Sequence, residues 1–434
     1  MKRLLMVTTA FPPMASGGIA RQLRFLKYLP EYGWETTVLS ARTSGPVPDP
    51  QGVRIVRAAA PGPRPVLRMG RRVEQRLRRV FHPFSSSDSS SPGARSAPLQ
   101  AARVSNKRHS SRSITFNRWV FVPDPDVGWI GPAIVAGRRL LRQEPFDAIL
   151  SSFPSGSAHL VAASLARRSG LPWIADYRDP WPTNRHYSYP TSAHRRAAEH
   201  LEAWALRHAA AATAVNGPIA DDLRRRHPHL ADRVHVLPNG FDRGEDVADV
   251  SLGEGFWFVY TGRLYRRLEQ TAHFLDAMAQ QADDVNVLFL GIDDPVIRAY
   301  AERLGCHTRV HLRPFVQRPQ ALGFQRAADA LLLVTGLAPE SLSSKVFEYL
   351  ASGRPVFAIT PSGSAAARLL ADAGGGRVVP PEADLTVALS RFIADVRAGA
   401  IPPADEAALA KYDGRALTRQ LSDWLDKVSQ ETRR

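Results

Sequence analysis

The chain has 434 residues, of which 44% are hydrophobic, and it contains a single cysteine, Cys306. This length favours two domains of about 200 residues each over one common core. A single cysteine excludes an intramolecular disulfide and a cysteine-based metal cluster, and it is typical of a protein of the reducing cytoplasm. No stretch approaches the roughly 20 apolar residues that span a bilayer, so we expect no integral membrane segment.

The net charge of +16 is concentrated in one stretch of the chain. Residues 64–112 hold twelve Lys or Arg against two acids, so they contribute +10. Residues 64–81 place apolar side chains on one helical face and arginines largely around the other, and a serine-rich tract follows at 85–91. The pattern is typical of a membrane-surface helix with a flexible loop, and equally of a solvated insertion. No base-reading motif accompanies it, so we expect no nucleic-acid partner.

The N-terminal segment predicts the start of a parallel sheet. Residues 3–9 have the pattern of a strand, and a turn leads from them into a helix that ends at Gly33. The apolar face of this helix consists of Ile19, Leu23, Leu26 and Leu29. A second strand at 36–40 completes a βαβ unit. The apolar start is short and precedes two prolines, so we interpret it as a buried strand rather than a signal peptide. The Gly-x-Gly-x-x-Gly fingerprint is missing, which argues against a dinucleotide site.

Strands, turns and helices alternate again after residue 119. Asp176, Arg178 and Asp179 follow a predicted strand, at the edge where parallel α/β sheets bind ligands. The same three side chains are also consistent with a salt-bridge network. A helix at 192–209 and a strand at 212–215 come next.

A second sheet begins after the acidic, glycine-containing stretch 243–255, which we interpret as a linker. Its predicted strands are 256–261, 285–290, 309–312, 330–334, 356–359 and 377–379. We therefore expect an α/β protein with an N-terminal domain at 1–242, which carries the basic insertion at about 63–118, and a second domain at 243–410. Residues 411–434 predict a C-terminal helix that packs either back on the first domain or on its own, second domain.

Two carboxylates, Glu340 and Glu348, bracket the start of a predicted helix that Gly353 closes. Unpaired N–H groups at a helix start, here around Leu342 and Ser343, are suited to a diphosphate. Glu348 on the helix can accept hydrogen bonds from a ribose diol, and Glu340 in the loop can reach sugar hydroxyls. The spacing by itself fits a capped surface helix with two solvated glutamates equally well.

The wider motif resembles a known donor site. Glu-x7-Glu followed by Tyr-Leu-Ala-Ser-Gly-Arg-Pro-Val is similar to the signature of retaining GT-B glycosyltransferases of family four. Glycines 17–18, Pro-Asn-Gly at 238–240 and Gly-Arg-Leu at 262–264 agree with the family in the same order. The resemblance covers most of the chain except about 50 residues after Pro63. It implies a GT-B fold, in which two Rossmann-like domains with parallel sheets face one another across a cleft.

The resemblance also implies roles for single residues. Gly17 and Gly18 match the glycine loop over the donor phosphates, and Arg263 matches the arginine that binds the diphosphate. Leu268 stands where the family has a lysine, so we take Arg267 as a substitute cation.

Further positions follow from the same resemblance. Phe315 or Val316 is expected near the base, and Lys345 is a further cation for the phosphates. The family often places a sugar-contacting histidine in the turn that Arg178 occupies here, which leaves the roles of His159 and Arg178 open.

The resemblance implies retaining, metal-independent transfer of a hexose from a UDP-, GDP- or dTDP-sugar to a hydroxyl of a glycan, lipid-linked saccharide or other acceptor. Arg263 would stabilise the leaving diphosphate, Glu340 would orient the sugar, and no cofactor is expected. We expect a role in cell-surface polysaccharide biosynthesis in the cytoplasm, with residues 64–82 on an anionic inner membrane face. A non-catalytic sugar-nucleotide-binding scaffold and a sugar-nucleotide epimerase are the alternatives, and the oligomeric state is left open.

Overall fold

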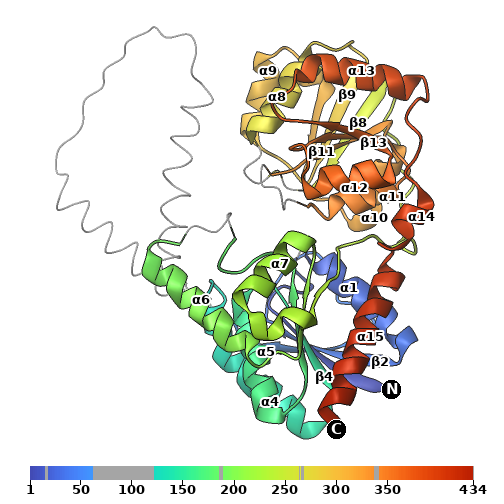
Figure 1. Cartoon of the computed structure of the whole chain (residues 1–434). Helices are drawn as coiled ribbons and strands as arrows, with labels where there is room; N and C mark the ends of the chain where they lie inside the picture. The colour runs from blue at the N-terminus through green and yellow to red at the C-terminus, as the bar shows by residue number, and fades with distance from the viewer. Residues whose placement is uncertain are drawn as a thin grey trace, which may run out of the picture.

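The computed structural model describes residues 1–14, 18–61, 122–184, 189–262, 264, 268–336 and 342–433. The predicted basic helix, the serine-rich tract, Gly17, Arg263, Arg267 and Glu340 lie outside these residues. Two parallel sheets, each covered by helices on both faces, form the two halves of the molecule (Figure 1).

The first half contains a seven-stranded sheet in the order β3-β2-β1-β4-β5-β6-β7, with every neighbouring pair parallel. Its strands are β1 (Lys2–Thr8), β2 (Trp34–Ala41), β3 (Arg54–Ala58), β4 (Ala148–Ser152), β5 (Trp173–Tyr177), β6 (Ala211–Ala214) and β7 (Val234–Val236). Its helices are α1 (Ile19–Tyr28), α4 (Ile130–Gln143), α5 (Gly156–Ser169), α6 (Ser192–Leu206) and α7 (Gly217–Arg226). Short 3₁₀ turns lie at η1 (Leu29–Tyr32), η2 (Val127–Trp129) and η3 (Pro228–Arg233).

The second half contains a six-stranded parallel sheet in the order β10-β9-β8-β11-β12-β13. Its strands are β8 (Phe256–Thr261), β9 (Val285–Leu290), β10 (Val310–Arg313), β11 (Ala330–Val334), β12 (Val356–Ile359) and β13 (Gly376–Val379). Its helices are α8 (Leu268–Ala279), α9 (Pro295–Arg303), α10 (Arg318–Ala327), α11 (Lys345–Ala351), α12 (Ala365–Ala373), α13 (Leu385–Arg397) and α14 (Glu406–Ala410), with a 3₁₀ turn η4 (His307–Arg309).

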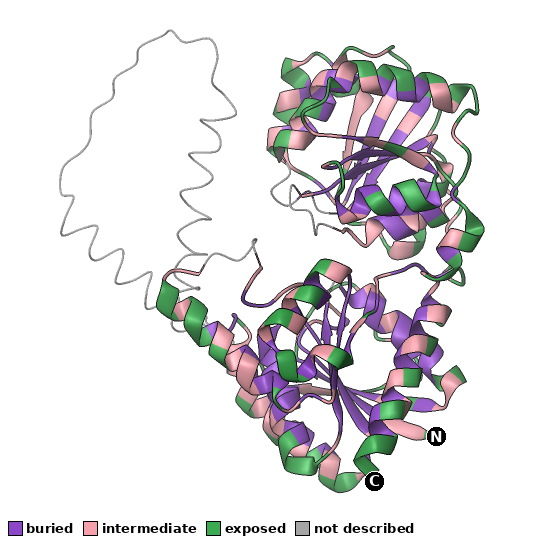
Figure 2. Cartoon of the chain, in the orientation of Figure 1, coloured by how far each residue is buried: buried purple, intermediate pink, exposed green. Residues whose placement is uncertain are grey.

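Inner strands such as β11 and β12 are apolar runs because both faces of each sheet are covered. All five residues of β11, Ala-Leu-Leu-Leu-Val, are buried. Figure 2 shows buried residues on the strands and exposed residues on the outer sides of the helices. In the first half α4 to α7 cover one face, while α1 and the C-terminal helix α15 (Gly414–Arg433) cover the other. In the second half α8, α9 and α13 lie opposite α10, α11, α12 and α14. The predicted α/β fold of two parallel-sheet halves is confirmed.

The chain crosses between the halves twice, and the two crossings are hydrogen-bonded to each other. The N–H of Phe241 donates to the carbonyl of Tyr412 at 3.2 Å, and the N–H of Gly414 donates to the carbonyl of Phe241 at 2.8 Å. Beyond this point α15 returns to the first half, where its apolar face packs with α1 and β1. That face consists of Leu417, Leu421, Leu425 and Val428. Asp426 on the helix accepts from Lys2 at the start of β1 at 2.8 Å.

The carboxyl ends of the first sheet's strands point toward the second half. The N terminus, where β1 begins, lies at the end of the first half that is away from the second (Figure 1). Because the sheet is parallel, the ends of β1, β4, β5 and β6 all lie on the side of the interdomain space. This is the edge at which open α/β sheets bind ligands.

Candidate functional site

Lys345, the first residue of α11, lies beside Gly262 in the turn that follows β8. Its Nζ donates to the hydroxyl of Tyr260 at 2.8 Å and lies 4.0 Å from the centre of the Tyr260 ring. Gly262 has φ of 87°, and a Cβ there would lie 3.0 Å from Lys345 Cε. Glycine is therefore needed at position 262 for the backbone conformation and for the close approach of the lysine. The fold brings together two parts of the predicted donor site that are 83 positions apart.

Tyr349 ties α11 to the same strand end. Its buried hydroxyl accepts from the N–H of Thr261 at 2.9 Å and lies 3.2 Å from Thr261 Oγ1, to which Gln325 Nε2 donates. Burial raises the pKa of the Tyr349 phenol, so it stays protonated at neutral pH. The role of Tyr349 could not be predicted from the sequence, because a tyrosine on the apolar face of a helix has the pattern of an ordinary core position.

The remaining donor-site residues of the second half lie around this point. Leu342 and Ser343 are half-buried and precede α11, and Leu342 packs against the core beneath that helix. Phe315, two residues after the end of β10, is 52% exposed, whereas Val316 packs against the core. An exposed aromatic ring at the carboxyl edge of a sheet is available for stacking on a planar base.

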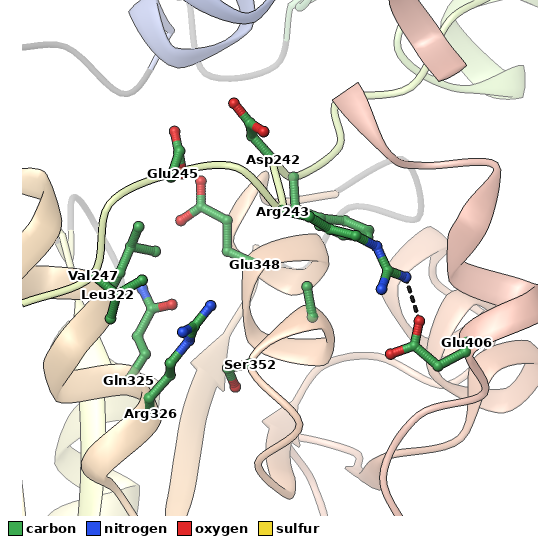
Figure 3. A pocket seen from close by; sticks show the side chains of 12 residues that line it. Asp242, Arg243, Glu245, Val247, Leu322, Gln325, Arg326, Glu348, Ser352 and Glu406 are labelled. Carbon is green, nitrogen blue, oxygen red and sulfur yellow. Dashed lines mark hydrogen bonds and ion pairs between the residues drawn. The ribbon is translucent and has the colours of Figure 1, made fainter. Parts of the chain in front are cut away.

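Glu348 is held by an arginine that sequence analysis did not single out. Arg318, the first residue of α10, donates through Nη2 to Glu348 Oε1 at 3.1 Å. It also forms a two-pronged ion pair with Glu245, at 2.6 Å through Nε and 2.5 Å through Nη2. Burial lowers the pKa of Arg318, but the two carboxylates outweigh burial and the pKa is raised overall. The carboxylates of Glu245 and Glu348 lie close together in Figure 3.

A pocket of about 220 Å³ opens beside Glu348, between the linker, α10, α11 and α14 (Figure 3). Its lining residues are Phe241, Asp242, Arg243, Glu245, Val247, Leu322, Gln325, Arg326, Glu348, Ala351, Ser352 and Glu406. Arg243 pairs with Glu406 across one side. Glu348 is the single predicted site residue in this set, so the pocket adjoins the predicted donor site without coinciding with it.

In the first half, Arg178 and Gly18 come together. Gly18 is buried where α1 begins, and Arg178 follows β5 and is half-buried. A Cβ at position 18 would overlap the guanidinium of Arg178. The structure thus places two predicted site residues in contact at the edge of the first sheet.

Asp176 belongs to a different, fully buried network. Arg21 on α1 donates to both of its oxygens, at 3.1 and 2.8 Å. The hydroxyls of Thr213 and Ser152 donate to it at 2.7 and 3.0 Å. Burial alone would raise the pKa of Asp176, but Arg21 and the hydroxyls hold it below the ordinary value. Arg21 also donates to the carbonyl of Pro238 at 2.6 Å, so the network fixes the segment that leads to the linker.

His159 lies in the core of the first half. Its side chain is fully buried among aromatic rings, and its Nδ1 lies 2.7 Å from Ser151 Oγ. Burial lowers its pKa to about 4, so the imidazole is neutral at physiological pH. The ring packs against Tyr177 and Trp181.

Neither a metal cluster nor a membrane-spanning helix is found in the described part of the chain. No group of three or more His, Cys, Asp or Glu side chains there is arranged to hold a metal ion. Among the helices of the described residues, none is both long and apolar enough to cross a bilayer.

Two family models match the chain, one in each half. Residues 93–245 match the model of glycosyltransferase family 4, and residues 255–395 match that of glycosyl transferases group 1. No curated protein matches the sequence.

Solved structures of the same fold are numerous. Anabaena HepE in complex with UDP has a TM-score of 0.64 at 15% identity, over 98% of this chain and 100% of that one. The lipopolysaccharide outer core galactosyltransferase WaaB has a TM-score of 0.57 at 12% identity, over 98% and 99%. A candidate UDP-N-acetylglucosamine 2-epimerase from Listeria monocytogenes has a TM-score of 0.55 at 11% identity, over 99% and 98%.

These likenesses establish the architecture, which is GT-B, and at such low identity they establish nothing beyond it. The fold alone does not distinguish a transferase from an epimerase, because both are found among the similar structures. The two family models do distinguish them, since both describe glycosyltransferases. With one match in each half, the chain is a GT-B glycosyltransferase.

Proposed function

We propose that this protein is a retaining, metal-independent glycosyltransferase that moves a hexose from a nucleoside diphosphate sugar to a hydroxyl of a glycan or lipid-linked saccharide. The observation that carries the proposal is the position of Lys345 at the Gly262 turn, within the half that matches glycosyl transferases group 1. A cation at the carboxyl edge of a parallel sheet is suited to a diphosphate. HepE, which shares the fold, has been crystallised with UDP and with UDP-glucose, which supports the choice of donor class.

The chemistry requires stabilisation of a departing diphosphate. As the bond from the anomeric carbon to the phosphate oxygen breaks, negative charge grows on the diphosphate and positive charge grows on the sugar ring. Lys345 would stabilise the negative charge on the diphosphate, together with Arg263 and Arg267, which are assigned this role from the sequence alone. Glu340 would orient the sugar, and Glu348 would accept hydrogen bonds from the ribose. The acceptor hydroxyl attacks on the face that the diphosphate leaves, and its proton passes to a phosphate oxygen.

The first half would supply the acceptor side of the reaction. Arg178 and Gly18 lie together at the edge of the first sheet that points toward the second half. Closure of the two halves over the donor would exclude water, which otherwise competes with the acceptor hydroxyl.

The central experiment is a thermal-shift panel of UDP, GDP and dTDP, because a ligand that binds the folded state raises its melting temperature. We expect one of the three to raise it clearly. The corresponding radiolabelled sugar nucleotide should then be hydrolysed slowly without acceptor and consumed faster with one. Absence of a shift with all three would refute the proposal, and binding without hydrolysis or transfer across a donor panel would favour a scaffold.

Two further assays address the finer features. Retention predicts that the new glycosidic bond has the anomeric configuration of the donor, which NMR of the product measures directly. Metal independence predicts unchanged turnover in EDTA. An epimerase would instead convert the free sugar nucleotide into its isomer with no acceptor present, and the same NMR experiment detects this.

The acceptor class rests on the basic stretch of the sequence. A net +10 within residues 64–112 suits an anionic bilayer, which favours a cytoplasmic protein at the inner membrane face in cell-surface polysaccharide assembly. Deletion of residues 64–112 should abolish sedimentation with anionic liposomes. Unchanged sedimentation of the deletion variant would remove the membrane part of the proposal.

A further inference from the structure

Arg318 joins two carboxylates that come from different parts of the chain. Glu348 belongs to α11, the helix of the predicted donor site, and Glu245 belongs to the linker between the halves. The two-pronged contact with Glu245 fixes the plane of the guanidinium, because both bonds of a planar fork must be satisfied together. Because the plane of the guanidinium is fixed, the direction of the hydrogen bond from Nη2 to Glu348 Oε1 is fixed as well.

This arrangement orients Glu348 without covering it. Arg318 binds Oε1, and among the described residues no other hydrogen bond to the Glu348 carboxylate is found, so Oε2 can accept from a ligand. The side chain of Glu348 is 12% exposed, and it lines the pocket beside the linker. A carboxylate with one oxygen fixed and the other accessible is suited to a pair of neighbouring hydroxyls.

The first half adds a second cation to the group, and this one is buried. Arg24 on α1 is 5% exposed, and its Nη1 donates to the carbonyl of Gly240. Burial lowers its pKa to about 10, and the attraction of Glu348 and Glu245 opposes that effect while Arg318 adds to it. Arg24 therefore lies within electrostatic reach of both carboxylates. The group contains Arg24 from the first half, Glu245 from the linker, and Arg318 and Glu348 from the second half.

We propose that Arg318 is a positioning residue of the donor site, which orients Glu348 toward the ribose hydroxyls and ties it through Glu245 to the linker. The inference rests on the proposed function, because it takes Glu348 to be the ribose-binding carboxylate. It adds that recognition of the ribose depends on two side chains, Arg318 and Glu245, that do not touch the nucleotide. It also makes the linker part of the donor site, so occupation of the site and the geometry of the connection between the halves are coupled.

The alternative is that Arg318 forms an ordinary stabilising ion pair. Its side chain is 36% exposed, and those of Glu245 and Glu348 are 21% and 12% exposed, so solvent screens the ion pairs in part and reduces their contribution to stability. A purely structural pair would affect all ligands of the second half alike. Substitution of a positioning residue would lower the affinity for ligands that carry a ribose diol and leave the affinity for ligands without one unchanged.

The experiment compares three ligands on the full-length protein by isothermal titration calorimetry. They are the nucleoside diphosphate that binds best in the panel above, its 2′,3′-dideoxy analogue and inorganic pyrophosphate. For Arg318→Met we expect about a tenfold loss of affinity for the ribose-containing diphosphate, the size of one hydrogen bond to a charged group. The dideoxy analogue and pyrophosphate should bind as to the wild type. In turnover, KM for the donor should rise with little change in kcat.

Three further variants complete the design. Glu245→Gln leaves Arg318 and Glu348 in place but removes the negative charge to which the Arg318 guanidinium donates. It should therefore lose affinity for the same ligand as Arg318→Met, but by a smaller factor. Arg318→Lys keeps a cation but cannot bind two carboxylates in one plane, so it should recover only part of the affinity. Arg397→Met removes an ion pair with Asp284 elsewhere in the same half and should change none of the three affinities.

Equal losses for all three ligands, or no loss for any, would overturn the inference. Melting temperatures of the free variants identify misfolding, and Glu245→Gln carries the test if Arg318→Met does not fold. If the wild type itself binds none of the diphosphates, the proposed function fails. If it binds and the variants show no selectivity, only the inference fails.

Discussion

The guanidinium of Arg178 fills the space that a side chain at position 18 would need. Gly18 is the N-cap of α1, the helix after β1, and Arg178 directly follows β5, so the contact joins the start of this helix to the end of β5. In the sheet, β4 lies between β1 and β5. Gly18 and Arg178 are therefore parts of one structural unit, although the sequence suggested separate roles for them.

Replacement of Gly18 by Ala should displace Arg178. We expect turnover to fall about tenfold, which corresponds to about 1.4 kcal/mol of transition-state stabilisation. The melting temperature should change little, because Arg178 is half-buried and can move aside. Steady-state kinetics with the best donor measures the effect. Gly131→Ala is the matched control, since a Cβ there meets nothing within 4 Å. Equal turnover of the two variants would contradict the role of this contact.

Lys345→Met should weaken the binding of diphosphates selectively. The variant retains the length and packing of the side chain beside Tyr260 but removes the charge at the Gly262 turn. Affinity for the nucleoside diphosphate should fall about tenfold, and affinity for the corresponding nucleoside should stay the same. Titration calorimetry with both ligands gives the comparison. Lys411→Met, an exposed lysine over the ring of Tyr412, is the control. A loss shared by the nucleoside would mean that the lysine acts through packing.

The fold could be predicted from the sequence because the inner strands of both sheets are buried on both faces. The strands predicted at 256–261, 285–290, 330–334 and 356–359 have those bounds in the structure. Continuous apolar runs bounded by turns are a strong local signal in a parallel sheet. The predicted helix 192–209 ends three residues earlier in the structure, at Leu206, where no glycine or proline marks the end. Local sequence patterns do not predict the order of the strands in each sheet, because that order depends on the packing of the whole domain.

The site was less predictable, because its charges have distant partners. Arg318 and Glu348 are 30 positions apart, and Arg21 and Asp176 are 155 apart. Nothing local to Asp176 indicates that its partner lies on α1, and the sequence suggested Arg178 and Asp179 nearby instead. Likewise the position of His159 in the core follows from the aromatic rings that surround it, which come from three separate segments.

Asp176→Asn should destabilise the first half strongly. The carboxylate and Arg21 are 2% and 3% exposed, so the variant leaves a buried guanidinium without its counter-charge. Loss of one partner of a buried ion pair costs about 3–5 kcal/mol. Urea denaturation followed by tryptophan fluorescence measures this, and Asp284→Asn, at an exposed pair with Arg397, should change stability by under about 1 kcal/mol. Similar effects of the two substitutions would show that the buried network is not essential to the fold.

Asp124 should make the protein less stable as the pH rises from 5 to 7. Burial raises the pKa of this carboxyl from 3.8 to about 6, so the folded protein holds a proton that the unfolded chain has released. Stability from this group is therefore lost as the pH rises, by about 1 kcal/mol over that interval. Asp124→Asn should abolish this part of the pH dependence. Denaturant titrations of both proteins at pH 5 and pH 7 give the difference, and an unchanged pH dependence would contradict the raised pKa.

His159 should act with the opposite sign in the same interval. Burial lowers its pKa from 6.5 to about 4, so below pH 6.5 the unfolded chain binds a proton that the folded protein does not. Stability therefore falls as the pH drops from 7 to 5, by about 2 kcal/mol. In His159→Asn, which can keep the contact with Ser151, that loss should vanish and the effect of Asp124 should remain alone. The variant should thus be more stable at pH 5 than at pH 7, whereas the wild type should be slightly less stable at pH 5. Denaturant titrations at both pH values, with the double variant Asp124→Asn/His159→Asn as the control without either group, measure the reversal. If the single variant keeps the acid sensitivity of the wild type, other groups cause it.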